Sequence, residues 1–180
     1  MQHHILIMGA AGCGSTSLAK AIAQKMHCPH FDTDEYYWLP TQPPYTQKRP
    51  IEEREQRLRE ALAPHPNWII SGVLCHWGQF IIPLLSHVIF LYADLPTRLN
   101  RIKNREESLF GDRILPTGDM HQHHQAFIEW ASQYDSNGQV SRTKSEHLSW
   151  LTTLPCQVSQ LDATINLETL IKEALNALKI

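Results

Sequence analysis

The residues best suited to chemistry form a glycine-rich stretch close to the start of the chain. It reads Gly-Ala-Ala-Gly-Cys-Gly-Ser-Thr over residues 9–16, between an apolar run at 4–8 and a segment with apolar residues at helical spacing. A glycine turn between a buried strand and a helix exposes backbone N–H groups, and the helix N-terminus adds partial positive charge. This arrangement predicts a loop that holds the phosphates of a nucleoside triphosphate, rather than a turn that only packs a helix on a strand. The expected nucleotide-binding residues are Gly9, Ala10, Ala11, Gly12, Cys13, Gly14, Ser15, Thr16 and Ser17.

One fixed position of the phosphate-loop pattern G-x-x-x-x-G-K-S/T is changed, because Ser15 replaces the lysine. Thr16 keeps the hydroxyl that ligates Mg²⁺ in such loops, with Ser17 beside it as an alternative. The lysine normally places charge on the β- and γ-phosphates during phosphoryl transfer. Three outcomes therefore stay open: an arginine elsewhere supplies the charge, transfer is slow, or the site binds nucleotide without catalysis. The candidate arginines are Arg101, Arg105, Arg113 and Arg142.

Two carboxylates, Asp32 and Asp34, follow the strand expected at residues 29–31. Ligands of open α/β proteins bind at this end of the sheet, so the two acids can have separate roles in a site there. Asp32 is suited to hold Mg²⁺ through water, and Asp34 to accept a proton from an attacking hydroxyl or to orient it. The simpler alternative is that one of them only caps the helix that starts near Glu35.

The next expected strand, at residues 68–72, ends in Ser71-Gly72, without the acid that many P-loop proteins carry at this point. Metal binding is therefore expected to rest on Thr16 and Asp32, with phosphate oxygens and water as the other ligands. The predicted catalytic residues are Asp34, Asp32, Arg105, Arg113 and Arg142.

Aromatic residues gather in the same region of the sequence. They are Tyr36, Tyr37, Trp38, Tyr45 and Trp77. They either wall a pocket for the phosphate acceptor or pack beneath the proline-rich segment at residues 40–50, and the sequence favours neither alternative.

The histidines at positions 121 and 124 are about one helical turn apart. Such a pair can bind a metal ion, but no further ligand is evident nearby. Polar histidines on a solvated helix are the more common explanation.

The pattern of apolar residues predicts strands that alternate with helices along the chain. Strands are expected at 4–8, 29–31, 68–72, 87–92 and 156–161, and helices follow them, with the last at 166–179. Alternation of this kind implies right-handed crossovers and a parallel sheet with helices on both faces. The expected fold is a three-layer α/β/α sandwich with a five-stranded parallel sheet. We expect one domain over residues 1–180, with a core at 1–104 and 155–180 and a helical, lid-like insertion at 105–154.

Composition narrows the class of partner. The charged fraction is 19% and the formal net charge is -2, so the basic excess typical of nucleic-acid-binding proteins is missing. The four cysteines are scattered without a C-x-x-C pair, which favours reduced thiols in a cytoplasmic protein. No apolar run approaches the roughly 20 residues that span a bilayer. The expected partners are a nucleoside triphosphate and a small acceptor, and the oligomeric state stays open.

Taken together, the loop at 9–16, the acid pair and the segment at 88–105 resemble the nucleoside-monophosphate-kinase and shikimate-kinase-like group of P-loop kinases. Asp32-Thr33-Asp34 looks like the D-S/T-D element of shikimate and gluconate kinases, whose first acid serves Mg²⁺ and whose second contacts the acceptor. The whole chain, with the segment at residues 31–38 as an example, is similar to uncharacterised bacterial proteins labelled adenylate-kinase-like or AAA-family ATPases. The resemblance covers residues 1 to about 110 and the final strand and helix.

Three functions are compatible with these features. The first is transfer of the γ-phosphate of ATP to a hydroxyl of a small molecule, with Mg²⁺ as cofactor. The second is an adenylate- or cytidylate-like nucleoside-monophosphate kinase, in which Arg49 and Arg54 would hold the acceptor phosphate. The third is a nucleotide-binding regulator that transfers nothing, which the replacement of the loop lysine by Ser15 motivates.

Overall fold

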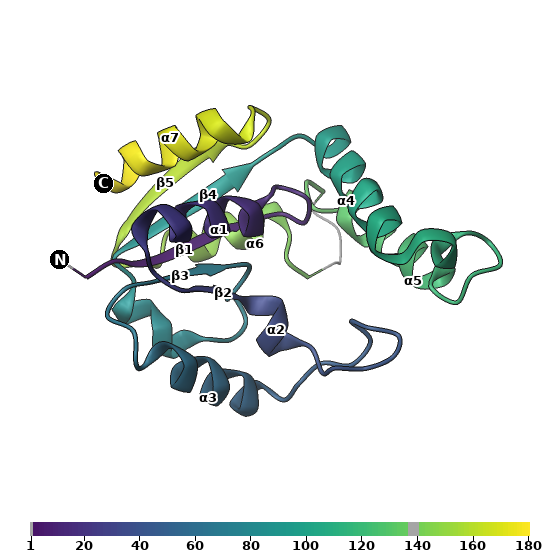
Figure 1. Ribbon diagram of the computed structural model, residues 1–180, viewed down its shortest axis with the longest axis horizontal. Helices are drawn as coiled ribbons and strands as arrows, with labels where there is room; N and C mark the ends of the chain where they lie inside the picture. Colours follow the sequence, from purple (N-terminus) through teal and green to yellow (C-terminus); the bar gives the residue numbers. More distant parts are fainter. Residues whose placement is uncertain (1, 137–140) are drawn as a thin grey trace.

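A parallel sheet forms the centre of the molecule, and helices lie on both of its faces (Figure 1). The computed structural model describes residues 2–136 and 141–180, so residues 137–140 of the predicted insertion lie outside the described residues. In chain order the elements are β1 (His4–Gly9), α1 (Ser15–Met26), β2 (His30–Asp32), α2 (Thr33–Tyr37), α3 (Ile51–Leu62), β3 (Trp68–Ser71), η1 (Gln79–Leu84), β4 (His87–Tyr92), α4 (Leu95–Phe110), η2 (Gly111–Ile114), α5 (His121–Ser132), α6 (Lys144–Leu151), β5 (Gln157–Asp162) and α7 (Leu167–Leu178).

The sheet has five strands in the order β2-β3-β1-β4-β5, and every neighbouring pair is parallel. β1 is the central strand: Leu6 is in register with Ile70 of β3 on one side and with Val88 of β4 on the other. The loop after β1 therefore leaves the sheet at the middle of its carboxyl-terminal edge. This sheet confirms the five parallel strands predicted from the sequence.

The alternation of side chains along β1 divides the core into two layers. Ile5 and Ile7 pack with buried residues of α1 and α7, whereas Leu6 and Met8 pack with buried residues of α3, η1 and α6. All four of these side chains have no exposed surface. The two apolar layers produce the predicted three-layer α/β/α arrangement, with α1 and α7 on one side of the sheet and α3 on the other (Figure 1).

Only part of the predicted insertion, residues 105–154, projects from the core. Its expected start at Arg105 lies inside α4, which continues to Phe110. Its last helix, α6, packs on the sheet, because Trp150 and Leu151 are buried among the residues of the α3 layer. The projecting arm consists of the end of α4 together with η2 and α5 (Figure 1). The sequence did not reveal this division because both parts of the segment are polar and helical.

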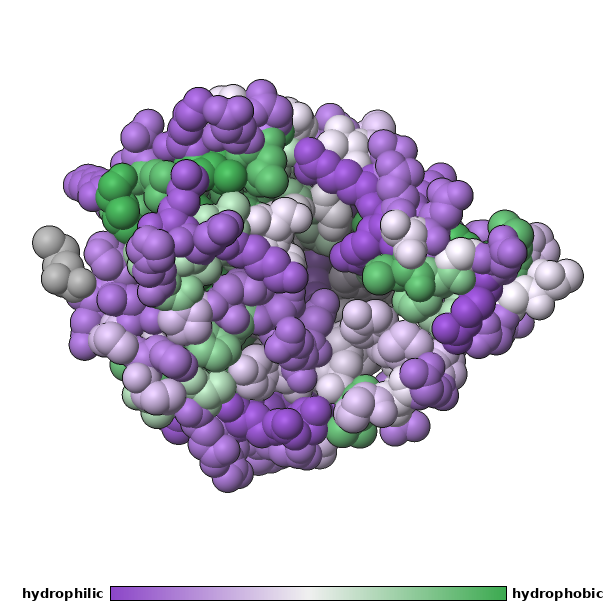
Figure 2. Space-filling view, in the orientation of Figure 1, coloured by the Kyte–Doolittle hydropathy of each residue, from purple (hydrophilic) through white to green (hydrophobic). Residues whose placement is uncertain are grey.

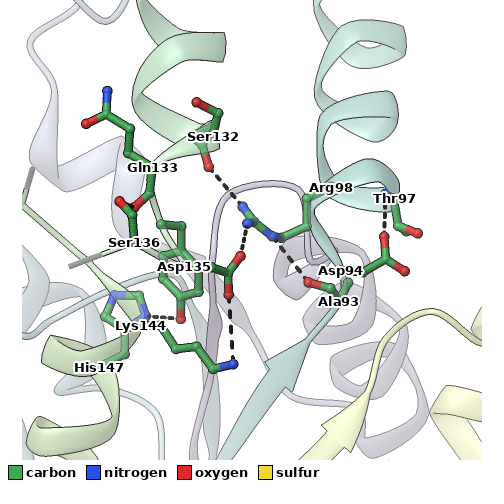
Figure 3. A network of polar contacts seen from close by, with 12 residues as sticks. Ala93, Asp94, Thr97, Arg98, Ser132, Gln133, Asp135, Ser136, Lys144 and His147 are labelled. Carbon is green, nitrogen blue, oxygen red and sulfur yellow. Dashed lines mark hydrogen bonds and ion pairs between the residues drawn. The ribbon is translucent and has the colours of Figure 1, made fainter. Parts of the chain in front are cut away.

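A buried cation joins this arm to the core (Figure 3). Arg98 in α4 is fully buried, and its guanidinium donates to the Ala93 carbonyl (3.2 Å), the Ala131 carbonyl (3.1 Å) and the Asp135 carboxylate (2.7 Å). Lys144 lies 3.8 Å from the other oxygen of Asp135. Every N–H-bearing arm of the guanidinium thus has an oxygen partner, which is what makes a buried cation tolerable. The contacts hold the C-terminal end of α5 against the start of α4.

In the part of the chain that the structure describes, no helix is both long enough and apolar enough to cross a membrane.

Candidate active site

The glycine-rich loop lies at the carboxyl end of the central strand and leads directly into α1. Gly12 has φ +84°, and a Cβ at this position would lie 2.5 Å from the Arg98 carbonyl oxygen, so only glycine fits there. Gly14, at φ +90°, precedes the first turn of α1, which contains no acidic residue. The free N–H groups and partial positive charge of this helix end are therefore not neutralised by the protein. Both features suit an anion.

Thr16 and Asp32 come together as the sequence predicted. The Thr16 hydroxyl donates to Oδ2 of Asp32 at 2.8 Å, which brings an alcohol and a carboxylate oxygen from α1 and β2 to one point. Oxygen ligands of this kind suit Mg²⁺, so the donor set fits the predicted metal. Oδ1 of Asp32 also accepts the backbone N–H of Asp34 at 3.1 Å and caps α2. Asp32 therefore caps α2, as the simpler alternative has it, while its other oxygen contacts Thr16, and its part in metal binding stays a prediction.

Two further residues join this pair, and the sequence analysis had not linked them to it. Ser71, fully buried at the end of β3, places Oγ 3.4 Å from Oγ1 of Thr16. Nε2 of His30 lies 2.9 Å from Oγ of Ser71. Burial lowers the pKa of His30, and the nearby Lys20 acts in the same direction while Asp32 opposes both. The spacing of His30 and Asp32, two residues apart on a strand, was a usable signal, because such residues point to the same face.

Asp34 lies in the first turn of α2, two residues after Asp32. Figure 2 shows the surface hollowed between the sheet edge and the α4–α5 arm. Asp34 keeps contact with solvent, but the surrounding protein desolvates its carboxyl group and raises its pKa. The negative charge of Asp32 raises the pKa further, whereas Arg142, Arg105 and the Trp38 side chain oppose the rise. A carboxylate in these surroundings is a better proton acceptor than an ordinary aspartate.

Of the three predicted catalytic arginines, the structure brings two toward Asp34. The charges of Arg105 and Arg142 both act on the Asp34 carboxyl group. Arg142 also lines, together with Ala11 and Trp130, a small cavity between α5 and the phosphate loop. Arg113 instead forms an exposed ion pair with Asp119 at 2.7 Å in the projecting arm. Its role in catalysis stays a prediction.

Arg101 is the remaining candidate to replace the loop lysine. It contacts the backbone of the phosphate loop. Its guanidinium donates to the backbone carbonyls of Cys13 at 3.4 Å and Ala163 at 2.8 Å. It therefore connects the phosphate loop to the turn after β5.

A third arginine, Arg54, lies on α3 beside Tyr37, although the sequence analysis named it only for the alternative function. Arg54 is buried, and its guanidinium lies 3.9 Å from the centre of the Tyr37 ring and 6.0 Å from that of Trp77. The Arg142 guanidinium lies 4.6 Å from the same Tyr37 ring. Neither arginine forms an ion pair with any carboxylate of residues 2–136 or 141–180. Two cations therefore flank one tyrosine, and neither has an ion-pair partner among the described residues.

The aromatic residues divide between the two alternatives that the sequence left open. Trp77 is almost completely buried and packs in the core beside α3. Tyr37, Trp38 and Tyr45 form a series of edge-to-face contacts, with ring centres 4.9 Å and 6.2 Å apart along it. The Tyr45 side chain is exposed on one side. Desolvation raises the pKa of its hydroxyl, the charge of Asp34 raises it further and Arg105 opposes the rise, so this series of rings lies near both charged groups.

The two histidines of α5 that the sequence singled out, at positions 121 and 124, each have a protein partner. Nδ1 of His121 lies 2.9 Å from the Ile114 carbonyl oxygen, and Nδ1 of His124 lies 2.6 Å from the Glu106 carboxylate. Both contacts hold α5 to the rest of the arm. Among the residues that the structure describes, no three His, Cys, Asp or Glu side chains converge as a metal site.

Residues 5–113 match the family described as "AAA domain". The chain belongs to this P-loop family. It is also 35% identical to "Uncharacterized protein YqaC" of Bacillus subtilis (strain 168) over 168 residues, which cover 92% of this chain and 93% of the relative.

Solved structures support the same fold. A shikimate kinase from Bacteroides thetaiotaomicron superposes with a TM-score of 0.55 at 17% identity, and the match covers 100% of both chains. A gluconokinase from Sinorhizobium meliloti 1021 superposes with a TM-score of 0.56 at 15% identity, covering 99% of this chain and 92% of the other. These likenesses confirm the shikimate-kinase-like P-loop fold inferred from the sequence. At this level of identity they establish the fold and not the reaction.

We expect Asp34→Asn to raise the midpoint of thermal unfolding at neutral pH. The pKa of Asp34 is higher in the folded protein than in the unfolded chain, so the folded state binds the proton more tightly. This contribution to stability is complete below the unfolded pKa of about 4 and is lost as the pH rises through the raised pKa. Asparagine carries no proton that can be lost, so its advantage over wild type should be largest near neutral pH and vanish in acid. Unfolding curves recorded across this range measure the effect.

Asp119→Asn is the matched control of opposite sign. The pKa of Asp119 is lowered, first by its hydrogen bond to Arg113, so the ionised form favours the folded state. This variant should not gain stability at neutral pH. A neutral or negative effect of Asp34→Asn at neutral pH would contradict the raised pKa.

Proposed function

We propose that this protein transfers the γ-phosphate of ATP to a hydroxyl group of a small anionic molecule, with Mg²⁺ as cofactor. The observation that carries the proposal is a pair of carboxylates beside the phosphate loop: Asp32 contacts the Thr16 hydroxyl at 2.8 Å, and Asp34 follows it in the first turn of α2. An attacking hydroxyl must lose its proton during transfer, and Asp34 is the group suited to accept it. Mg²⁺ would be held by Thr16 and, through water, by Asp32, and would neutralise charge on the phosphate oxygens.

The same carboxylates favour a hydroxyl acceptor over a phosphate acceptor. A nucleoside monophosphate attacks through a phosphate oxygen that is already negatively charged, so it needs no base. Asp32 and Asp34 would also repel that phosphate, since like charges in a poorly solvated cleft interact strongly. A nucleoside-monophosphate kinase is therefore the less supported alternative.

An anionic group on the acceptor accounts for the unpaired cation on α3. Arg54 is buried beside Tyr37 and Trp77, and its Nε donates to the Arg49 carbonyl at 2.6 Å. Its remaining N–H groups donate to none of the described residues, and they keep some contact with solvent. A carboxylate or sulfonate on the acceptor would complete these contacts as charge-assisted hydrogen bonds, which are stronger than neutral ones. Arg54 thereby fixes the end of the acceptor away from the reacting hydroxyl.

Arg142 is the group best placed to supply the charge that the missing lysine would bring. It lies between Ala11 of the phosphate loop and Tyr37 of α2, and its charge acts on Asp34. An anion seated on the loop amides would therefore be close to this guanidinium. Arg105, on the arm, is a second source of positive charge on the same cleft.

A regulator that binds ATP without transferring phosphate is the third possibility, and Ser15 is the feature that favours it. Asp34, Arg54 and Arg142 argue against it, because a binding module needs none of these groups. We also propose a reducing, cytoplasmic location, which the four free cysteines support.

The test is a screen of acceptors with ATP and Mg²⁺, read out as ADP and as phosphorylated product. The panel contains hydroxylated carboxylates, neutral sugars and polyols, and nucleoside monophosphates. We expect product with a hydroxylated carboxylate, and we expect Asp34→Asn to lower its turnover by about 10²–10⁴-fold. Arg54→Ala should raise the KM for the acceptor with little change in kcat. Product with nucleoside monophosphates alone would establish the alternative kinase, and ATP binding without any product would establish the regulator.

A second experiment tests the substitute for the loop lysine. We expect Arg142→Ala to lower kcat on the order of 10³-fold, as expected for loss of an arginine that stabilises the transferring phosphoryl group. Adding Ser15→Lys to this variant should restore at least part of kcat, because the lysine returns charge to the same phosphates. Arg57→Ala is the control, since this exposed arginine of α3 pairs only with Glu53. A double variant that is no better than Arg142→Ala would contradict the assignment.

A further inference from the structure

Four polar side chains form one continuous chain of contacts behind the phosphate loop. Nε2 of His30 lies 2.9 Å from Oγ of Ser71, Oγ of Ser71 lies 3.4 Å from Oγ1 of Thr16, and Oγ1 of Thr16 lies 2.8 Å from Oδ2 of Asp32. The members come from β2, β3 and α1, and the chain ends on the residues that fit Mg²⁺. Ser71 occupies the strand end where many P-loop proteins carry an acid. A neutral hydroxyl therefore stands at this position in place of a carboxylate.

The direction of every hydrogen bond in the chain follows from the number of protons. An ionised Asp32 can only accept hydrogen bonds, so the Thr16 hydroxyl donates its single proton to Asp32. Thr16 can then only accept from Ser71, so the Ser71 proton is used on Thr16. In the arrangement that uses all three contacts, Ser71 in turn accepts from His30, so Nε2 of His30 carries a proton. This holds for the neutral Nε2–H form and for the imidazolium alike.

We propose that His30 and Ser71 are positioning residues for the Thr16 hydroxyl and prepare it to bind Mg²⁺. With its proton on Asp32 and one lone pair engaged by Ser71, the Thr16 oxygen keeps its remaining lone pair for the metal. Without the His30 N–H, Ser71 can direct its proton to another acceptor, and the Thr16 hydroxyl loses one of the two contacts that fix it. The inference rests on the proposed function, because the metal would arrive with the nucleotide.

A second histidine provides a matched control. Nε2 of His87 in β4 lies 2.9 Å from Oγ of Ser159 in β5, so it makes the same cross-strand contact at the same length. Burial lowers the pKa of both histidines. Neither His87 nor Ser159 is hydrogen-bonded to a residue of the phosphate loop.

The experiment is calorimetric titration with ADP, in the presence of Mg²⁺ and in the presence of a chelator. We expect His30→Phe to weaken binding of the magnesium complex by about 10-fold, as typical for loss of a residue that orients a metal ligand, and to leave binding of free ADP unchanged. His30→Gln, whose amide can donate from nearly the same position, should recover most of the loss. His87→Phe should bind both forms as wild type does.

Nitrogen-detected NMR of the imidazole rings provides a readout that needs no nucleotide. We expect a proton on Nε2 of His30 in the free protein. A neutral His30 protonated only on Nδ1 would overturn the inference, as would equal losses for His30→Phe with and without Mg²⁺ or no loss at all. If wild type binds no ADP under either condition, the proposed function and this inference fail together. If wild type binds and only the magnesium-specific effect of His30→Phe is missing, this inference fails alone.

Discussion

The buried guanidinium of Arg98 is the interaction on which the surroundings of the site depend. Its side chain holds the end of α5 through the Ala131 carbonyl and Asp135. Its backbone carbonyl lies against Gly12, where no side chain would fit. One residue thus sets the distance between the phosphate loop and the projecting arm. Because a buried charge that loses a partner is strongly destabilising, this geometry has little freedom to vary.

The charges of the site are assembled by the fold rather than by the loop itself. In the common phosphate-loop pattern a lysine supplies charge from within the loop, but here Ser15 is neutral. The positive groups instead come from separate elements: Arg54 from α3, Arg105 from α4 and Arg142 from the segment before α6. Arg105 and Arg142 both act on Asp34, and Arg54 and Arg142 lie against the same Tyr37 ring. In the proposed reaction, charge on the transferring phosphate would depend on the packing of α4 and of the segment before α6, and binding of the acceptor's anionic group would depend on α3.

The sequence predicted the elements with strong local signals. The glycine loop, the five strands and the pairing of Thr16 with Asp32 followed from a motif and from apolar periodicity, and the structure confirms the fold. The chain of His30 and Ser71 did not follow, because it needs the register in which β2 lies beside β3. The core position of α6 was also missed, since Trp150 and Leu151 are its only strongly buried apolar residues. Contacts set by tertiary packing have no local pattern that the sequence could show.

Calorimetric titration with ATP and Mg²⁺ tests the central claim, that the loop after β1 binds nucleotide phosphates. The comparison is wild type, Gly14→Asp and Gly111→Asp. Both glycines have positive φ, and a Cβ at either would meet no atom within 4 Å, so neither substitution causes a clash. Gly111 has ψ -132° and Gly14 has ψ 22°, so a side chain at Gly111 is the more strained of the two and makes the stricter control. Only Gly14 lies in the phosphate loop, where an added carboxylate repels phosphate. The account predicts that wild type and Gly111→Asp bind and that Gly14→Asp does not. Absence of binding in wild type, or equal binding by all three, would contradict it.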